Sequence, residues 1–167
     1  MSGEHVLVCV AWPYANGPLH LGHVAGCYLP PDIQARFERS KGNKVLMVSG
    51  SDEHGTPITV AAETQGVNPQ DIVDKYHSIN SKALLDLGCS WEPKMDPRGS
   101  DYGGSLFNRT SDPEHHEIVS ENFVSLLNAG LFERKVMQQY YEIRDDGGRF
   151  LPDRSVSYTH LTLPTKA

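Results

Sequence analysis

Two short apolar segments, each followed by a helical pattern, constrain the fold of this chain more than any other feature. Residues 5–10 (HVLVCV) and 44–49 (KVLMVS) are apolar and rich in β-branched side chains. Nearly continuous apolar runs of this length are typical of strands in a parallel sheet that is covered on both faces. Their alternation with helices predicts an α/β, Rossmann-like fold: a parallel sheet with flanking helices.

The first helix is expected between these two strands. Its apolar side chains recur at helical spacing, and Ile33 and Phe37 are expected to face inward. Pro30 and Pro31 predict a kink or a restart, because proline cannot donate a main-chain hydrogen bond. Gly42 is expected to close the helix, since glycine readily adopts the left-handed conformation of a C-terminal cap.

Three further helices are indicated by their first residues. Thr56 and Asn68 are expected to be N-caps, each followed by a proline, and Asp112-Pro113 opens the third helix. Two of these helices carry apolar stripes that are expected to be buried. The stripes are Ile72, Tyr76, Ile79, Ala83 and Leu87 in one helix, and Ile118, Val119, Phe123, Leu126 and Leu127 in the other.

The remaining segments indicate how the chain is organised. Residues 90–110 are rich in proline, glycine and aspartate and are expected to be irregular. Strands are expected from Leu131, with Asp146-Gly147 as a hairpin turn. We therefore expect an α/β domain at residues 1–130 and the start of an insertion at residues 131–154.

Composition excludes several classes of protein. The 167 residues are 38% hydrophobic and 22% charged, as in an ordinary globular protein, and the net charge of −6 argues against a surface wholly devoted to nucleic acid. No apolar run is long enough to cross a bilayer, and the N-terminus lacks the basic start of a signal peptide. The three cysteines form no CxxC pair. These features predict a cytoplasmic protein with no membrane association.

Residues 155–167 are expected to be a non-native tail. Residues 156–165 (VSYTHLTLPT) resemble the translation of a transposase sequencing adapter, and they continue no pattern from the preceding segment. A segment of this origin carries no information about the fold. The natural reading frame is therefore expected to end near Arg154.

The segment 13–23 (PYANGPLHLGH) stands where the first strand leads into the first helix. Open parallel sheets bind nucleotides at this point, because the amino end of the helix attracts phosphate. The common GxGxxG pattern is absent, so other groups must bind the phosphates. His20 and His23 share one helix face and can both donate hydrogen bonds to one phosphate group. Gly22 between them leaves bare main chain on which a flat base can rest.

The spacing of the two histidines alone leaves other interpretations open. They can be ordinary surface residues, or they can cap the first helical turn. They can also be metal ligands, with Asp52, Glu53 or His54 completing the set.

Two ordered motifs resemble those of one family. PYANGPLHLGH resembles the HIGH signature of class I aminoacyl-tRNA synthetases, and residues 49–57 (SGSDEHGTP) resemble the second-strand motif of the methionine enzymes. The longer stretch AWPYANGPLHLGHVAGCYLPPDI and the later GRFLPDR resemble the archaeal-type branch of methionyl-tRNA synthetases. The likeness runs in order from about Val6 to Arg154. It implies an N-terminal fragment that holds half of the catalytic domain and the start of the connective, zinc-knuckle insertion.

This resemblance implies ATP-dependent activation of methionine to methionyl-adenylate and its transfer to tRNA(Met), with Mg²⁺ bound to ATP. His20 and His23 are then catalytic residues, which donate hydrogen bonds to phosphate oxygens as negative charge grows there. The implied ATP site consists of Tyr14, Asn16, Gly17, His20, Gly22 and His23.

The resemblance also implies an amino-acid site formed by Ala11, Trp12, Tyr14 and Asp52. Asp52 is expected to pair with the ammonium group of methionine, and the aromatic rings to meet its thioether. Asp52 can instead be a turn residue, and Tyr14 can be plain core packing. The family often has leucine in place of Trp12, which leaves the shape of the pocket open. His54 is expected to hold the turn.

The remaining functional parts of the family are expected outside this chain, and the fragment alone is expected to be inactive. Structural zinc, the KMSKS signature and the anticodon-binding helices belong to the missing C-terminal part, and no metal site is expected here. Lys94-Met95 is not the KMSKS signature, because Asp-Pro-Arg follows it. The basic residues of the last segment are expected to be solvated rather than bound to tRNA; they are Arg134, Lys135, Arg144, Arg149 and Arg154.

Three other functions compete with this one. A compact nucleotidyltransferase with the same His-x-Gly-His pattern would turn over ATP with a phosphoester instead of methionine. A non-catalytic module would bind nucleotide or RNA without turnover. A zinc hydrolase would use His20, His23 and His54 as ligands and would contain stoichiometric zinc.

Overall fold

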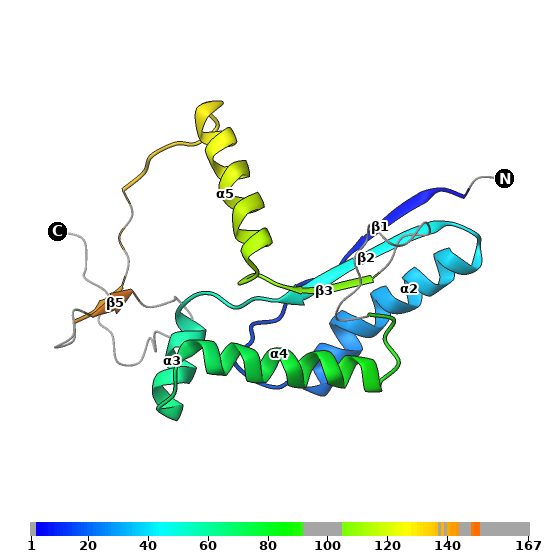
Figure 1. Cartoon of the computed structure of the whole chain (residues 1–167), viewed down its shortest axis with the longest axis horizontal. Helices are drawn as coiled ribbons and strands as arrows, with labels where there is room; N and C mark the ends of the chain where they lie inside the picture. The colour runs from blue at the N-terminus through cyan, green and yellow to red at the C-terminus, as the bar shows by residue number, and fades with distance from the viewer. Residues whose placement is uncertain (1–2, 92–104, 137, 139, 144–147, 151–167) are drawn as a thin grey trace. The chain divides into compact units, whose positions relative to one another are not determined.

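The computed structural model describes residues 3–91, 105–136, 138, 140–143 and 148–150. The chain divides into two compact units, Met1–Asn122 and Phe123–Ala167 (Figure 1). Several predictions fall outside the described residues: the tail at 155–167, the Lys94-Met95 loop, the turn at Asp146-Gly147, and Arg144 and Arg154.

A parallel sheet lies at the centre of the first unit. It consists of β1 (His5–Cys9), β2 (Lys44–Ser51) and β3 (Ser105–Arg109) in the order β1-β2-β3, and both strand pairs are parallel. The prediction of an α/β parallel sheet with flanking helices is confirmed. The prediction of an irregular segment at 90–110 is wrong for β3, because this short strand forms through pairing with β2 and carries little apolar pattern of its own.

One face of the sheet carries the core. Val6 and Val8 pair with Val45 and Met47 in register, and all four side chains join the same apolar cluster. Leu7, on the opposite face of β1, is 62% exposed. His5 and Cys9 share this face with Leu7 and are exposed as well, because alternate side chains of a strand point to the same face. The prediction that β1 is covered on both faces is therefore wrong within the described residues.

The helical segment after β1 changes its type along its length. It runs through α1 (Leu21–His23), the π-helical turn η1 (Val24–Tyr28) and α2 (Leu29–Ser40). The two prolines lie in the first turn of α2, and the expected kink takes the form of the π turn that precedes them. The cap at Lys41-Gly42 is confirmed, since Gly42 has a φ of 88°.

The expected inward face of α2 is wrong. Ile33 and Phe37 are 64% and 55% exposed, whereas Asp32 and Ala35 are buried. Tyr28, Asp32 and Ala35 are buried and follow one another at helical spacing, so they form the inward face. An apolar pattern misses this face because its middle position is the charged Asp32, which is buried with hydrogen bonds from Ser90 and Arg36.

Two helices connect β2 to β3: α3 (Thr56–Gln65) and α4 (Pro69–Asp86). Asn68 is confirmed as the N-cap of α4, and it forms a capping box with Asp71. The N-cap of α3 is Gly55, not Thr56 as predicted. Gly55 has a φ of 96°, which favours glycine over any other residue at this cap.

The buried face of α4 is shifted from the predicted stripe. Its buried residues are Ile72, Val73, Asn80 and Leu84, while Ile79 and Leu87 are 42% and 53% exposed. This face contacts two clusters at once. Ile72 and Val73 pack with α3, and Leu84 packs under the sheet. A pattern of apolar residues therefore cannot predict that the polar Asn80 is buried on this face.

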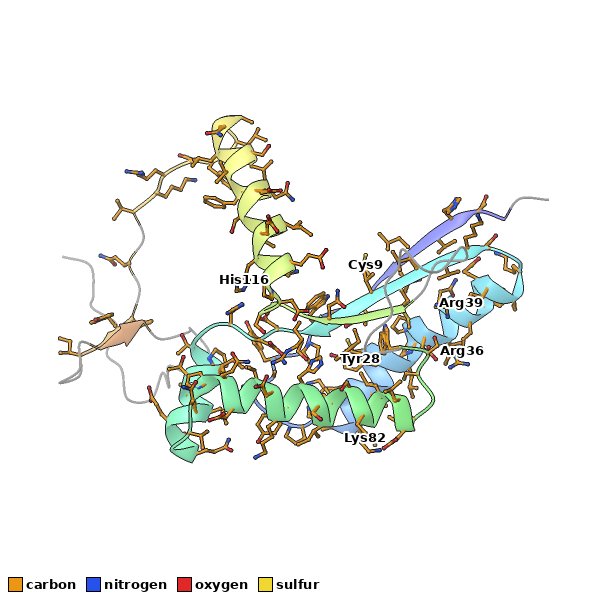
Figure 2. The ribbon with its side chains drawn as sticks, in the orientation of Figure 1. Cys9, Tyr28, Arg36, Arg39, Lys82 and His116 are labelled. Carbon is orange, nitrogen blue, oxygen red and sulfur yellow. The ribbon has the colours of Figure 1, made fainter. Side chains whose placement is uncertain are left out.

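The core is divided between these two clusters. The cluster under the sheet contains Val10, Tyr28, Ala35, Val45, Met47, Leu84, Cys89, Trp91 and Phe107. The ring of Trp91 contacts those of Tyr28 and Phe107, with centroids 5.8 and 5.7 Å apart. Figure 2 labels Tyr28, which extends from the helical segment into this cluster. The second cluster contains Ala15, Ile58, Ala62, Ile72 and Val73. Ala15 belongs to the loop after β1, so the second cluster anchors that loop.

Helix α5 (Pro113–Asn128) begins after Asp112 as predicted, and Gly130 follows it with a φ of 71°. Its apolar stripe is exposed, however, with 40–58% of each side chain accessible. The prediction that this stripe is buried is therefore wrong among the described residues. Of the strands expected from Leu131, the described residues contain a two-residue antiparallel pair, β4 (Tyr141–Glu142) with β5 (Arg149–Phe150).

Asp32 joins α2 to the segment that follows α4. Its carboxylate accepts hydrogen bonds from Ser90 N, at 2.7 Å, from the Ser90 hydroxyl, and from Arg36 Nε at 2.8 Å. Arg36 also donates to the carbonyl of Gly88, and Arg39 donates to Ser90 Oγ at 3.1 Å (Figure 2). This polar junction closes the edge of the core beside Trp91.

We expect Asp32→Asn to lower the free energy of unfolding by about 1.5–3 kcal/mol at pH 7, the value of hydrogen bonds to a charged group. Burial opposes the charged form, but the bonds from Ser90 and Arg36 outweigh it and hold the pKa of Asp32 below its ordinary 3.8. Such a group stabilises the fold above its unfolded pKa, and this contribution is lost as the pH falls through the folded pKa. The loss should therefore shrink below about pH 4 in urea unfolding of the chain.

The matched control is Asp86→Asn on the exposed end of α4, where Asp86 pairs with the exposed Lys82. This variant should unfold like the parent chain at both pH values. A loss for Asp32→Asn that is equal at pH 7 and pH 3 would contradict the assigned cause.

Candidate active site

The loop after β1 is joined to the end of β2 by main-chain hydrogen bonds. Asp52 N donates to Pro13 O at 2.8 Å, and Ala15 N donates to Asp52 O at 2.9 Å. Tyr14 and Asp52 thus face each other as an isolated parallel bridge. Both residues lie beyond the carboxyl ends of their strands, the edge at which open parallel sheets bind ligands.

Ala11 and Trp12 lie on the same stretch. The hydroxyl of Ser49 donates to Ala11 O at 3.1 Å, and the ring of Trp12 lies 5.8 Å from that of His115. Gly50 of β2 allows this packing: a Cβ there would lie 2.6 Å from Trp12 Cζ3 and 2.3 Å from Asn108 O. The structure therefore brings the four predicted amino-acid-binding residues to one edge of the sheet.

Core packing was the alternative role for Tyr14, and a turn residue was the alternative role for Asp52. Tyr14 is 39% exposed, so it is not core packing. Asp52 does act as a turn residue, because its Oδ1 accepts a hydrogen bond from His54 N at 3.4 Å. A carboxylate has about four acceptor positions on its two oxygens. The turn contact therefore leaves Asp52 able to bind a cation as well.

His20 and His23 cap the helix that begins at Leu21. His20 Nδ1 accepts a hydrogen bond from His23 N, and His23 Nδ1 accepts one from His20 N, both at 3.3 Å. The two rings stack with centroids 3.7 Å apart and planes at 17°. Capping, one of the alternatives for these histidines, is thus what the structure contains. It also fixes both imidazoles side by side at the amino end of the helix.

This capping determines which nitrogen carries the proton on each ring. A neutral imidazole has one donor and one acceptor nitrogen. Because both Nδ1 atoms accept main-chain N–H groups, Nε2 must bear the hydrogen in each neutral ring. The two Nε2–H groups are therefore the donors available to an anionic ligand, which the sequence alone could not establish.

The other predicted ATP-binding residues lie in the loop before this pair or, in the case of Gly22, between the two histidines. A Cβ on Gly22 would lie 3.0 Å from His20 Cε1, so the missing side chain leaves room for the His20 ring. The carbonyl of Gly17 accepts a hydrogen bond from Asn80 Nδ2 at 3.1 Å. Asn16, next to it, is exposed. Glycine at 22 thus has a structural reason in addition to the expected contact with a base.

A polar cluster that the sequence did not predict lies next to Asp52 and is centred on Glu53. The buried carboxylate of Glu53 accepts hydrogen bonds from Arg109 Nε at 2.8 and 3.0 Å and from the Ser111 hydroxyl. Arg109 also pairs with Asp74 of α4. These contacts join the ends of β2 and β3 to α4 immediately beside Asp52. In the sequence, Glu53 lies between Asp52 and His54 and resembles an exposed turn residue. Its role follows from its contact with Arg109, which is distant in the sequence.

His77 of α4 completes the same cluster. Its Nδ1 lies 2.8 Å from Ser51 Oγ and 3.9 Å from Glu53 Oε1. Burial and the nearby Arg109 lower the pKa of His77, against the attraction of Glu53. A neutral His77 can therefore accept or donate one hydrogen bond to Ser51 without adding charge beneath the site.

His54 holds the turn, as expected. Its Nε2 lies 3.2 Å from Thr110 O and 3.1 Å from His116 Nε2. Among the described residues, no three or more His, Cys, Asp or Glu side chains are grouped so that they could hold a metal ion. Within the same part of the chain, no helix has the length and apolarity that a membrane span requires.

A parallel sheet whose first strand leads to a helix capped by two histidines, with a half-buried carboxylate at the end of the neighbouring strand, is the arrangement of a nucleotide-binding α/β domain. Within that class, residues 6–161 match the family model described as tRNA synthetases class I (M), and the chain belongs to this family. The matched range runs past Arg154, and the non-native tail stays a prediction.

Relatives and solved structures agree with this family. The chain is 46% identical over 156 residues to the methionine–tRNA ligase of Chlorobium luteolum and to that of Roseiflexus sp.. These alignments cover 93% of this chain but only 20% and 24% of those proteins, so it spans about a quarter of their length or less. The Mycobacterium tuberculosis methionyl-tRNA synthetase in complex with methionyl-adenylate has a TM-score of 0.64 at 26% identity, covering 92% of this chain and 27% of that one.

Proposed function

We propose that the complete protein containing this segment is a methionine–tRNA ligase, which activates methionine with ATP and transfers it to tRNA(Met). The observation that carries the proposal is the pair of imidazoles at the amino end of the first helix, whose Nε2–H groups serve as anion donors. The names of the relatives, and the methionyl-adenylate complex of a structural neighbour, support this choice. We further propose a cytoplasmic enzyme, with any structural zinc outside this chain.

In the first step, a carboxylate oxygen of methionine attacks the α-phosphorus of ATP. The new oxygen–phosphorus bond forms as the bond to pyrophosphate breaks, and pyrophosphate leaves with the Mg²⁺ that entered as part of the substrate. A ribose hydroxyl of the terminal tRNA adenosine then takes the aminoacyl group and loses its proton, and AMP leaves. No protein nucleophile is needed, so the protein contributes positioning and charge stabilisation.

The chain's own residues divide this work between the two strand ends. His20 and His23 donate Nε2–H bonds to phosphate oxygens, where hydrogen bonds to an anion are strong. Tyr14, Asn16, Gly17 and Gly22 form the rest of the ATP site. Asp52 binds the ammonium group of methionine, and Ala11, Trp12 and Tyr14 line its side-chain pocket. The main-chain bridge between Tyr14 and Asp52 supports this division, because it holds the ends of the two strands together.

We expect Asp52→Asn in the complete ligase to raise KM for methionine and to lower kcat/KM for methionine by about 10–150-fold, the value of a hydrogen bond to a charged group. The isosteric amide can still accept the hydrogen bond from His54 N, so the turn is retained. KM for ATP should change little. Methionine-dependent ATP–pyrophosphate exchange measures all three constants.

The control is Asp86→Asn, which makes the same chemical change on the exposed end of α4. It should leave the exchange kinetics unchanged. If Asp52→Asn keeps the parental kcat/KM for methionine, Asp52 is a turn residue only and the amino-acid site must lie elsewhere.

A further inference from the structure

One polar side chain interrupts the apolar face of α4. Asn80 is 1% exposed and lies on the same buried face as Ile72, Val73 and Leu84. Burial of a carboxamide is unfavourable unless its hydrogen-bonding groups are satisfied. An apolar residue would fill this helix position without that penalty, so the contacts of Asn80 indicate what it does.

Both ends of the Asn80 carboxamide contact the loop that leads to His20. Its Oδ1 accepts a hydrogen bond from Leu19 N at 3.0 Å, and its Nδ2 donates to Gly17 O at 3.1 Å. The two loop groups flank Pro18, which has no N–H of its own. One side chain thus satisfies a main-chain donor and a main-chain acceptor that are two residues apart.

The loop is held at two places by different means. Its first half, at Pro13 and Ala15, is bonded to the main chain of Asp52. Its second half is bonded to the Asn80 side chain, at the residue directly before His20. His20 has an extended conformation with φ −111° and ψ 170°, and the helix starts after it. The bond to the Leu19 amide therefore fixes the position of His20. Because His20 and His23 cap each other, it also fixes the position of the pair of imidazoles.

We propose that Asn80 is a positioning residue for the phosphate-binding histidines. It does not touch the reacting atoms; it acts through the 17–19 segment, on the basis of the proposed function of His20. Only a side chain with both an acceptor and a donor can make the two contacts, so aspartate would lose the bond to Gly17 and leucine would lose both.

The test uses the complete ligase and methionine-dependent ATP–pyrophosphate exchange. Asn80→Leu has nearly the same volume and an apolar character suited to its neighbours, and we expect kcat to fall about 10–100-fold, since small misplacements of catalytic groups have effects of this size. KM for methionine should change by less than about twofold, because main-chain bonds hold the Asp52 side. Leu84→Ala, on the same buried face, controls for general loosening of α4 and should keep kcat when assayed well below its unfolding temperature.

A double-mutant cycle shows whether Asn80 acts through His20. In a His20→Ala background, Asn80→Leu should lower kcat by no more than about twofold, because the group it positions is already absent. Equal factors in both backgrounds would overturn the proposal. If His20→Ala itself keeps full activity, the proposed function of His20 fails instead, and the positioning role fails with it.

Hydrogen–deuterium exchange separates a failure of the contact from a failure of the catalytic role. We expect the peptide containing residues 17–24 to exchange faster in Asn80→Leu than in Leu84→Ala or the parent enzyme. Unchanged exchange in this peptide would overturn the proposal whatever the kinetics show. Faster exchange with an unchanged kcat would also overturn it, since the contact would then serve the fold alone.

Discussion

Replacement of His20 or His23 by alanine in the complete ligase is expected to lower kcat for methionine-dependent ATP–pyrophosphate exchange by about 10²–10³-fold, the effect of removing one preorganised donor to a developing negative charge. Each variant removes an Nε2–H group whose tautomer is fixed by the reciprocal cap. KM for methionine should change much less than kcat, because Asp52 and its strand end remain. The exchange assay at saturating methionine measures the loss directly.

Alanine at position 20 also removes the helix cap that the His20 side chain provides. A second variant is therefore needed to distinguish the effect of the lost cap from that of the lost hydrogen-bond donor. Asparagine is a favoured N-cap residue, and at position 20 it can still accept a hydrogen bond from the main chain of the first turn. We expect His20→Asn to keep the unfolding midpoint of the parent enzyme and to lose nearly as much activity as His20→Ala. His5→Ala, at the exposed start of β1, is the control for loss of a histidine. Full activity of His20→Asn would show that capping is the only function of His20.

Local chemistry was sufficient to predict the parts of the site that depend on adjacent residues. The loop at 13–23 follows β1 directly and ends in two histidines three residues apart. Asp52 follows β2 in the same way. Since the carboxyl ends of parallel strands meet at one edge, the order of strands and helices alone places these residues together. The bridge between Tyr14 and Asp52 agrees with that reasoning.

Contacts between distant segments were not predictable from the same reasoning. Glu53 and Arg109, like Asn80 and Gly17, are more than fifty residues apart, and nothing in their neighbourhoods links them. The apolar period also fails on α2, because the charged Asp32 occupies its buried face while Ile33 and Phe37 are exposed. Buried polar residues on helix faces are the features that a hydrophobic pattern misses.

Glu53 is expected to have the largest effect on stability. Its carboxylate is fully buried and makes two hydrogen bonds with Arg109 and one with Ser111. Removal of one partner of a buried ion pair destabilises a protein by up to about 3–5 kcal/mol, and here Arg109 would keep only its pair with the half-exposed Asp74 among the described residues. We expect a loss of this size for Glu53→Gln in urea unfolding of the chain, a large share of the roughly 5–15 kcal/mol that stabilises a typical domain.

The matched control is Glu121→Gln on the exposed surface of α5, which should leave the urea midpoint unchanged. Arg109→Gln tests the partner: since the two residues share one network, the double variant should lose less than the sum of the single losses. A variant that fails to fold is the strongest form of the expected result, whereas an unchanged midpoint for Glu53→Gln contradicts it. Because Glu53 directly follows Asp52, the same substitution in the complete ligase should also raise KM for methionine, which links the stability of this buried pair to the amino-acid site above it.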